Sequence, residues 1–338
     1  MNSSSRTLPQ VEPIRLDAPS GMGERVDDRY KDLRLAVLIP CYTEAAAIEQ
    51  VVAGFRTALP GARIIVFDNN STDATVTLAA KAGAETRHVY QQGKGHVVRR
   101  MFADVEADVY LLVDGDATYD AASAPAMIDR LLHEELDMVV ACRRDSESAA
   151  YRPGHRFGNR VLTEFVAHVF GRAFTDILSG YRVFSRRFAK SFPALATGFE
   201  IETELTVHAL ELRMPIGEVE TPYYARLEGS ASKLHTYRDG WRIFTTIIRL
   251  YQLQRPLSFF TSIAGVLAAA SVLLAVPLII TYFQTGLVPR LPTAVLTTGM
   301  MVLASLSVTC GLILDNVTRG RQELKRLHYL GIEGPGRH

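Results

Sequence analysis

The sequence is poor in cysteine and carries almost no net charge. Three cysteines among 338 residues, Cys41, Cys142 and Cys310, are widely separated, which argues against a disulfide framework and a cysteine zinc site. Lys and Arg total 37 against 36 for Asp and Glu, so the basic field typical of a nucleic-acid-binding protein is absent. We therefore expect a chain that folds in a reducing compartment and has no nucleic-acid partner.

The first thirty residues lack the apolar segment of a secretory signal peptide. Met1–Arg29 are polar and contain Pro, Gly, Ser and charges of both signs. Such a composition buries too little apolar surface to fold alone, so we expect a flexible tail over residues 1–33. Folding then begins at Leu35, on the cytoplasmic side of the membrane.

Short apolar runs alternate with helical patterns from Leu35 to Cys142. The runs are rich in Val, Ile and Leu and mostly unalternating, as in strands covered on both faces. They are Leu35–Ile39, Arg63–Phe67, Glu85–Val89, Val109–Val113 and Met138–Cys142. The helical patterns are Glu44–Ala58, Asp73–Ala82, His96–Ala107 and Ala121–Glu134. This alternation predicts a parallel α/β sheet with flanking helices, whose ligands bind beyond the carboxyl ends of the strands.

The next part of the chain indicates mixed α and β structure, with helices at Phe157–Phe170 and Glu200–Glu211. We expect one catalytic domain over residues 34–236. Residues 237–257 then combine Trp, Ile, Phe and Leu with regularly spaced arginines, which favours an amphipathic helix on the lipid headgroups. An ordinary surface helix packed on the core is the alternative.

Two long uncharged apolar runs distinguish the C-terminal part. Phe259–Ile280 has 22 residues and Leu291–Leu314 has 24. At ~1.5 Å per residue each run reaches ~33 Å or more, enough for a ~30 Å hydrocarbon core. We expect a transmembrane hairpin over residues 258–314. Basic residues flank its outer ends and only Arg290 lies in the connection, so the positive-inside rule places a basic tail over residues 315–338 in the cytoplasm.

The sharpest motif is Asp114-Gly115-Asp116, which directly follows an apolar run. Side chains two apart on an extended backbone share a face, and two carboxylates there supply hard oxygen ligands for Mg²⁺ or Mn²⁺. Gly115 would let a diphosphate approach the backbone closely. A metal at this strand end would neutralise the charge on a leaving diphosphate. The pattern alone also occurs in ordinary turns, so its place in the sheet matters.

Polar segments follow the neighbouring strands as well. Ile39–Glu44 ends the first strand and Asp68–Asp73 ends the second, with carboxylates and amides that suit a base and ribose hydroxyls. Gly93–Gly95 opens the third helix around Lys94, where backbone amides and the lysine favour phosphate. Taken singly, each loop could equally be a turn or a helix cap. The dinucleotide-binding motif G-x-G-x-x-G is absent here, because Val98 occupies the position of its last glycine.

Residues Leu35 to about Tyr251 resemble the glycosyltransferases of family 2. Within that family they resemble the polyprenyl-phosphate branch, which includes dolichyl-phosphate mannose synthases and bactoprenol glucosyltransferases. The matching segments are Ile39–Glu44, Asp68–Asp73, Gly93–Gly95, Asp114–Asp116, Asp176–Arg182 and Arg226–Lys233. The resemblance implies a GT-A-type fold, a nucleotide-sugar donor, a divalent metal cofactor (Mg²⁺ or Mn²⁺) and a polyprenyl phosphate acceptor.

The resemblance also implies a role for each matched position. The residues expected to bind the donor nucleotide are Pro40, Tyr42, Glu44, Asp68, Lys94 and Asp114. The metal is assigned to Asp114 and Asp116, with Thr118 as a third ligand, and Asp176 joins the two aspartates as a catalytic candidate. The residues expected to grip donor and acceptor phosphates are Arg143, Arg156, Arg226 and Lys233. The Arg226–Lys233 loop has the composition of a lid over a diphosphate.

The chain departs from the family pattern at several positions. Thr118 stands where a metal-binding Gln is common, and Thr43 stands where Asn is common. The signature Q-x-x-R-W of processive synthases is missing, since the single Trp, Trp241, lies in Gly-Trp-Arg. These departures argue against a polysaccharide synthase and leave the third metal ligand in question.

A phosphate acceptor fits the arginine-rich motifs. A phosphate monoester is already anionic at pH 7, so it needs orientation by arginine forks rather than a general base. In-line attack would invert the anomeric carbon, in a pathway of cell-envelope glycan synthesis. Two alternatives are a transferase acting on a lipid or glycan hydroxyl, with Asp176 as a candidate base, and a catalytically silent membrane scaffold. The sequence leaves open whether the chain forms a homo-oligomer.

Overall fold

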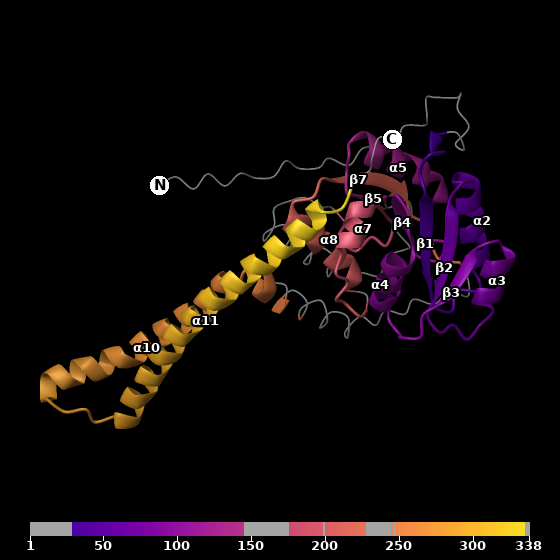
Figure 1. Ribbon diagram of the computed structural model, residues 1–338. Helices are drawn as coiled ribbons and strands as arrows, with labels where there is room; N and C mark the ends of the chain where they lie inside the picture. The colour runs from indigo at the N-terminus through magenta and orange to yellow at the C-terminus, as the bar shows by residue number, and fades with distance from the viewer. Residues whose placement is uncertain are drawn as a thin grey trace. The chain divides into compact units, whose positions relative to one another are not determined.

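The computed structural model of the protein describes residues 29–144, 176–198, 200–227, 245, 248–249 and 251–334 (Figure 1). The chain divides into two compact units. The first, here called the catalytic unit, comprises residues 1–241 together with 325–338, and the second comprises residues 242–324. Each unit has its own architecture, and the site described below belongs to the catalytic unit.

A seven-stranded mixed sheet forms the centre of the catalytic unit. Its strands are β1 (Leu35–Cys41), β2 (Arg63–Asp68), β3 (Glu85–His88), β4 (Val109–Leu112), β5 (Met138–Arg144), β6 (Arg182–Ser185) and β7 (Ile216–Pro222). Their order across the sheet is β3-β2-β1-β4-β6-β5-β7. Every neighbouring pair is parallel except the two that β6 makes with β4 and β5. The five strands expected from apolar runs are thus confirmed, whereas the antiparallel β6 was not predicted.

Helices cover both faces of this sheet (Figure 1). They are α2 (Ile48–Ala58), α3 (Thr75–Lys81), α4 (Lys94–Asp104), a 3₁₀ turn (Ala121–Ser123), α5 (Ala124–His133), α7 (Arg186–Ser191) and α8 (Ile201–Leu212). Helix α2 contacts α3 and α5, and α4 contacts α7 and α8. Alternate residues of β1 serve the two layers: Val37 and Ile39 join the core cluster of α2 and α5, and the intervening Leu38 is buried on the other side.

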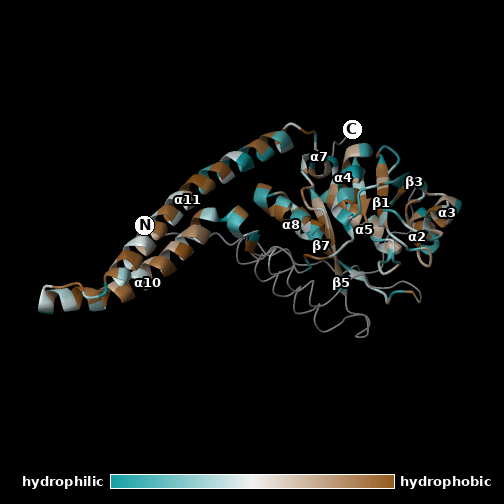
Figure 2. Ribbon diagram, turned by 90° about the horizontal axis from the view of Figure 1, so that it is seen from below, coloured by the Kyte–Doolittle hydropathy of each residue, from teal (hydrophilic) through white to brown (hydrophobic). Residues whose placement is uncertain are grey.

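The second unit contains two long helices joined by a short connection. Helix α10 spans Pro256–Thr285 and α11 spans Leu291–Leu330, and both are long and apolar enough to cross a membrane. The hydroxyl of Ser271 donates to the carbonyl of Thr297 across them, and a Cβ on Gly311 would lie 3.0 Å from Phe260 Cβ. Hydrophobic colouring runs along α10 and much of α11 (Figure 2). Their large apolar side chains are mostly exposed, as expected for surfaces that meet lipid.

Both helices extend beyond the predicted spans. Helix α10 continues to Thr285, and α11 continues through the segment expected to be a basic tail. The last turns of α11 belong to the catalytic unit, where Lys325 Nζ lies 2.8 Å from Glu211 Oε2 and the Tyr329 hydroxyl donates to Asp137. Most of the expected interfacial helix lies outside the described residues, although Thr245 and residues 251–254 are helical.

Candidate functional site

The Asp-Gly-Asp motif begins two residues after β4, at the carboxyl edge of the parallel strands. Asp116 is buried, with 5 % of its surface exposed, and Ala117 adopts a left-handed backbone (φ 58°) that turns the chain away from the strand. A Cβ on Gly115 would lie 2.6 Å from Cys41 Sγ at the end of β1. Gly115 is therefore required by the close packing of two strand ends, a role that the sequence argument gave instead to diphosphate approach.

Both oxygens of Asp116 have partners. Oδ1 accepts from the backbone amide and the hydroxyl of Thr118, at 3.2 and 2.6 Å. Oδ2 lies 2.9 Å from the guanidinium of Arg226, which follows β7. Thr118 thus orients Asp116 in this arrangement, and its expected role as a third metal ligand stays a prediction. Arg226 and Asp116, far apart in sequence, are brought together as the motif assignments require.

Asp114 lies between a lysine and a glycine. Its Oδ1 is 2.5 Å from Lys94 Nζ, and the same ammonium lies 2.5 Å from Glu202 Oε1. A Cβ on Gly180 would lie 2.2 Å from Asp114 Oδ2, so only glycine fits there. Burial alone would lower the pKa of Lys94, but attraction from Asp114 and Glu202 outweighs it and raises that pKa. Lys94 is therefore a permanent cation at the Asp-Gly-Asp motif.

A second ion pair of the site joins Arg143 and Asp176. Arg143, near the end of β5, grips Asp176 with two hydrogen bonds of 2.6 and 2.8 Å, and its guanidinium lies over the ring of Tyr223. The Gly180 amide donates to the hydroxyl of Tyr119, and burial raises the pKa of that hydroxyl. Both oxygens of the Asp176 carboxylate are therefore engaged by one guanidinium. This geometry disfavours Asp176 as a general base.

Arg182 supports the loop that carries Asp176. Its side chain is fully buried and donates to the carbonyls of Ile177 and Ser179 and to the hydroxyl of Thr206. These bonds fix the backbone that presses Gly180 against the metal motif. Burial lowers the pKa of Arg182, although the nearby carboxylates oppose that shift. The sequence argument placed Arg182 in a motif but gave it no role.

The residues expected to bind the nucleoside lie at the ends of β1 and β2. Asp68 is buried, accepts from the Ser71 amide, and has its Oδ2 3.0 Å from Nδ1 of His88. Tyr42 is exposed, whereas Pro40 and Glu44 are half-buried. The polar positions available for a base and ribose therefore do gather at one edge.

The two asparagines of this edge have a structural task that the sequence did not reveal. The Asn69 amide donates to the carbonyls of Val89 and Gln91 and its oxygen accepts from the Gly93 amide, while Asn70 donates to Tyr90. They hold the segment that leads into α4. This segment places Lys94 at the first turn of that helix.

The carboxylates and cations at this edge fit a divalent metal bound together with a diphosphate. Within the described part of the chain, no three His, Cys, Asp or Glu side chains gather into a metal site. Mg²⁺ and Mn²⁺ with nucleotides need only one or two carboxylates, since phosphate oxygens and water complete the shell. Asp114 and Asp116 satisfy that requirement, and Lys94 and Arg226 beside them suit the phosphates.

Sequence reasoning missed one carboxylate of the site, Glu202. It alternates with Glu200 and Glu204 at the start of α8, and such spacing points successive side chains to different helix faces. Only the packing of α8 shows that Glu202 is the one turned inward, 6 % exposed. Arg156 and Lys233, expected to grip phosphate, lie outside the described residues.

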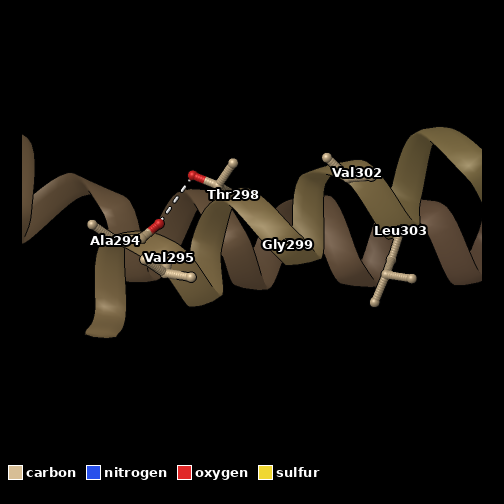
Figure 3. A pocket seen from close by; sticks show the side chains of 6 residues that line it. All are labelled: Ala294, Val295, Thr298, Gly299, Val302 and Leu303. Carbon is tan, nitrogen blue, oxygen red and sulfur yellow. Dashed lines mark hydrogen bonds between the residues drawn. The ribbon is translucent and has the colours of Figure 1, made fainter. Parts of the chain in front are cut away.

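A shallow pocket on α11 is not part of this site. It is lined by Ala294, Val295, Thr298, Gly299, Val302 and Leu303 (Figure 3). The hydroxyl of Thr298 donates to the carbonyl of Ala294 in its own helix, so the pocket offers little polar chemistry. A lipid-facing helix surface explains it.

The fold and the charged edge define a GT-A-type glycosyltransferase. The profile of glycosyl transferase family 2 matches residues 36–192. The glycosyltransferase AglJ of Haloferax volcanii is 37 % identical over 231 residues, which cover 68 % of this chain and 76 % of that protein. This chain therefore belongs to glycosyltransferase family 2, as the motifs predicted.

Two further comparisons add detail. A dolichyl-phosphate hexose transferase of the same archaeon is 26 % identical over 217 residues, 64 % of this chain and 93 % of that protein. A crystal structure of glucosyl-3-phosphoglycerate synthase from Mycobacterium tuberculosis, with Mn²⁺ and UDP-glucose, superposes with a TM-score of 0.59. It is 21 % identical and covers 72 % of this chain and 86 % of its own, so this likeness shows the fold alone.

Proposed function

We propose that the protein transfers a sugar from a UDP- or GDP-sugar to a polyprenyl phosphate at the cytoplasmic face of a membrane, with inversion at the anomeric carbon. The observation that carries this proposal is the set of cations paired with the carboxylates of the site. Lys94, Arg143 and Arg226 each lie within 3 Å of an aspartate at the carboxyl edge of the sheet. Such side chains bind phosphates, and a lipid phosphate acceptor and a diphosphate leaving group both need them.

The donor side follows from the strand ends. Asp68 and its neighbours offer acceptors for a base and ribose, and Asp114 and Asp116 would hold Mg²⁺ or Mn²⁺. Bound there, the metal would neutralise the charge that develops on the departing diphosphate. Lys94, as a permanent cation, adds a second positive charge without any proton transfer. The structural neighbour with Mn²⁺ and UDP-glucose has the same fold and supports this assignment.

The acceptor side favours a phosphate over a hydroxyl. Attack by a hydroxyl needs a base, and the carboxylate once considered for that role, Asp176, is held in an arginine fork. A phosphate oxygen is ionised before it binds, so orientation by arginines is sufficient. The relative named dolichyl-phosphate hexose transferase supports a lipid phosphate as acceptor.

The membrane helices would bring a lipid acceptor within reach of the enzyme. Basic residues lie outside both apolar spans, which favours an inner-membrane hairpin with cytoplasmic ends. We expect a cysteine at Thr285 to be labelled from outside intact cells and a cysteine at Glu323 to be protected, both in a Cys310→Ser background because Cys310 is exposed. The reverse labelling would place the catalytic unit away from cytosolic donors and contradict the topology.

The decisive experiment for the activity supplies membranes with labelled nucleotide-sugars and undecaprenyl phosphate. A panel of UDP- and GDP-sugars is tested one at a time, and the lipid fraction is then extracted. We expect label in a lipid whose sugar–phosphate bond is released by mild acid. Equal transfer to free polyprenol or to a glycan hydroxyl would overturn the acceptor assignment.

A further inference from the structure

Glu202 is a carboxylate of the site to which the proposed chemistry assigns no role. It is the second residue of α8, its side chain is 8 % exposed, and its Oε1 lies 2.5 Å from Lys94 Nζ. Its other oxygen, Oε2, is buried and has no partner among the described residues. A buried carboxylate with a spare acceptor is uncommon, since such groups are normally satisfied. The unpartnered, buried Oε2 of Glu202 therefore suggests a functional role for this side chain.

Lys94 and Glu202 are held by backbone segments that contact each other closely. A Cβ on Gly93 would lie 2.1 Å from the Thr197 carbonyl, and one on Gly95 would lie 2.2 Å from the Ala196 carbonyl. The segment that bears these carbonyls is fixed to α8, because Glu204 accepts from the amides of Leu195 and Ala196. The start of α4 and the start of α8 are therefore fastened together, independently of Asp114.

Asp114, by contrast, has two possible partners for its carboxylate: Lys94, and a donor with its metal. In this structure its Oδ1 holds Lys94. A donor with its metal would compete with Lys94 for this carboxylate. When Asp114 turns to the donor, Lys94 loses one of its two carboxylates, and its ammonium must stay in place to meet the diphosphate. Glu202 is already bonded to it and has an oxygen to spare.

We infer that Glu202 is a positioning residue that retains the Lys94 ammonium beside the donor diphosphate when Asp114 changes partner. Lys94 has three N–H donors, so it can contact a phosphate oxygen while remaining on Glu202. Oε2 of Glu202 then accepts the hydrogen bond that Asp114 gives up. This inference rests on the proposed function, because it takes the ligand of Lys94 to be a nucleoside diphosphate.

The test compares nucleotides that differ by one phosphate. Affinities of the purified full-length protein for UDP, UMP, GDP and GMP are measured by calorimetry with Mn²⁺. Glu202→Gln keeps the shape but removes the charge, and Glu200→Gln, an exposed change at the start of the same helix, is the matched control. We expect Glu202→Gln to weaken diphosphate binding about tenfold and monophosphate binding less than about twofold, as for a lost partner of a buried charge pair.

A double-mutant cycle separates positioning from direct contact. In a Lys94→Met background, Glu202→Gln should cause no further loss, because Glu202 acts through the lysine. Glu202→Asp, which retains the charge, should recover part of the diphosphate affinity. If Glu202→Gln fails to fold, Glu202→Asp replaces it in the comparison of diphosphate and monophosphate binding. Equal weakening of both nucleotides, full additivity with Lys94→Met, or lost transfer with unchanged diphosphate affinity would each overturn the inference. A wild-type protein that binds neither UDP nor GDP would instead overturn the proposed function.

Discussion

The catalytic unit and the helical hairpin use the same residue types in different ways. A leucine at position 195 of the catalytic unit is 69 % exposed, and Leu273 in α10 is 74 % exposed. Leu195 lies in a short loop segment whose backbone amide donates to Glu204, and a single exposed leucine of this kind is ordinary for a protein in water. Leu273 lies in a 22-residue run without any charge, so its exposure indicates lipid. Exposure alone does not reveal the solvent, whereas the surrounding composition does.

Glycines show the same contrast. Gly95 and Gly180 have no room for a Cβ, because backbone or carboxylate oxygens lie about 2.2 Å from its position. Gly265 and Gly299 have nothing within 4 Å of that position. In the catalytic unit, glycine is a steric requirement that brings charged groups together. At Gly265 and Gly299 of the hairpin, it is one of the small residues that membrane helices commonly contain.

The largest expected effect is a loss of sugar transfer on changing Asp116, at the carboxyl edge of the sheet. Asp116→Ala removes a proposed metal ligand, so transfer should fall on the order of 10³-fold or more, since a bound metal would supply several kcal/mol of transition-state stabilisation. Transfer of labelled sugar to polyprenyl phosphate measures this, and the thermal unfolding midpoint checks that the variant is folded. Asp114→Asn should have a smaller effect.

Asp108→Asn is the matched control for Asp116→Ala. Asp108 lies at the opposite end of β4 and pairs with Arg34 at the surface, at 2.6 Å. Its loss should leave turnover within about twofold, because exposed ion pairs contribute little. If Asp116→Ala retained near-normal turnover with Mg²⁺ or Mn²⁺, the metal would not depend on the Asp-Gly-Asp motif.

The next effect tests the difference between the two exposed leucines. Leu273→Arg places a charge near the centre of an apolar span, which costs roughly 3 kcal/mol for membrane insertion. Leu195→Arg should be nearly neutral, because its surroundings are aqueous. The fraction of each variant that stays in membranes after alkaline extraction is measured. Equal behaviour of the two variants would show that α10 is not in lipid.

A smaller, selective effect is expected at Arg226. Because Arg226 contacts Asp116 where a metal would bind, Arg226→Ala should tighten Mn²⁺ binding to the nucleotide-free protein by about three- to tenfold. The same change should weaken UDP or GDP binding, since a phosphate-binding cation is lost. Paramagnetic resonance of free Mn²⁺ gives the first affinity, and Arg63→Ala, at an exposed pair with Glu85, is the control. Weaker Mn²⁺ binding would contradict a competition between Arg226 and the metal.

The sequence predicted most of this fold because the strands are apolar and strongly patterned. All five strand predictions from Leu35 to Cys142 are confirmed, and the helix predicted at Asp73–Ala82 corresponds to α3, which ends just before Gly83, whose φ of 93° suits glycine. Strand β6 was missed because four residues between a loop and a helix carry no periodicity. Its antiparallel pairing depends on contacts with β4 and β5 that local sequence does not encode.

The candidate site was only partly predictable for a related reason. Motif residues such as Asp114 and Lys94 follow strands, so topology brings them together. What the motifs could not show is the pairing of each carboxylate with a cation, because the partners of Asp116 and Asp176 come from other strands. Buried residues without a motif, above all Glu202, become visible only when α8 is packed in place.

Acid should affect the two units differently. Burial, and then the nearby charge of Lys325, lower the pKa of His208 to about 3. The imidazole packs edge-to-face against both Phe188 and Phe192, with Nε2 3.2 Å from the Ser191 hydroxyl. As the pH falls below the usual histidine pKa of ~6.5, the unfolded chain takes up a proton that the folded unit refuses. The contribution of this imidazole to the free energy of unfolding is therefore complete above pH ~6.5 and is lost progressively as the pH falls towards ~3. At pH 5 the free energy of unfolding should be lower by about 2 kcal/mol. His208→Asn should remove this part of the acid sensitivity, whereas His133→Asn, at an exposed position of α5, should not.

Hydrogen exchange at pH 7 and pH 5, followed separately in peptides of each unit, measures the change. The two spans contain no ionisable Asp, Glu, Lys, Arg or His, so their exchange, corrected for its intrinsic pH dependence, should not respond. If acid opened the hairpin as readily as the catalytic unit, or if His208→Asn kept the full sensitivity, the origin of the acid response would lie elsewhere than this buried imidazole.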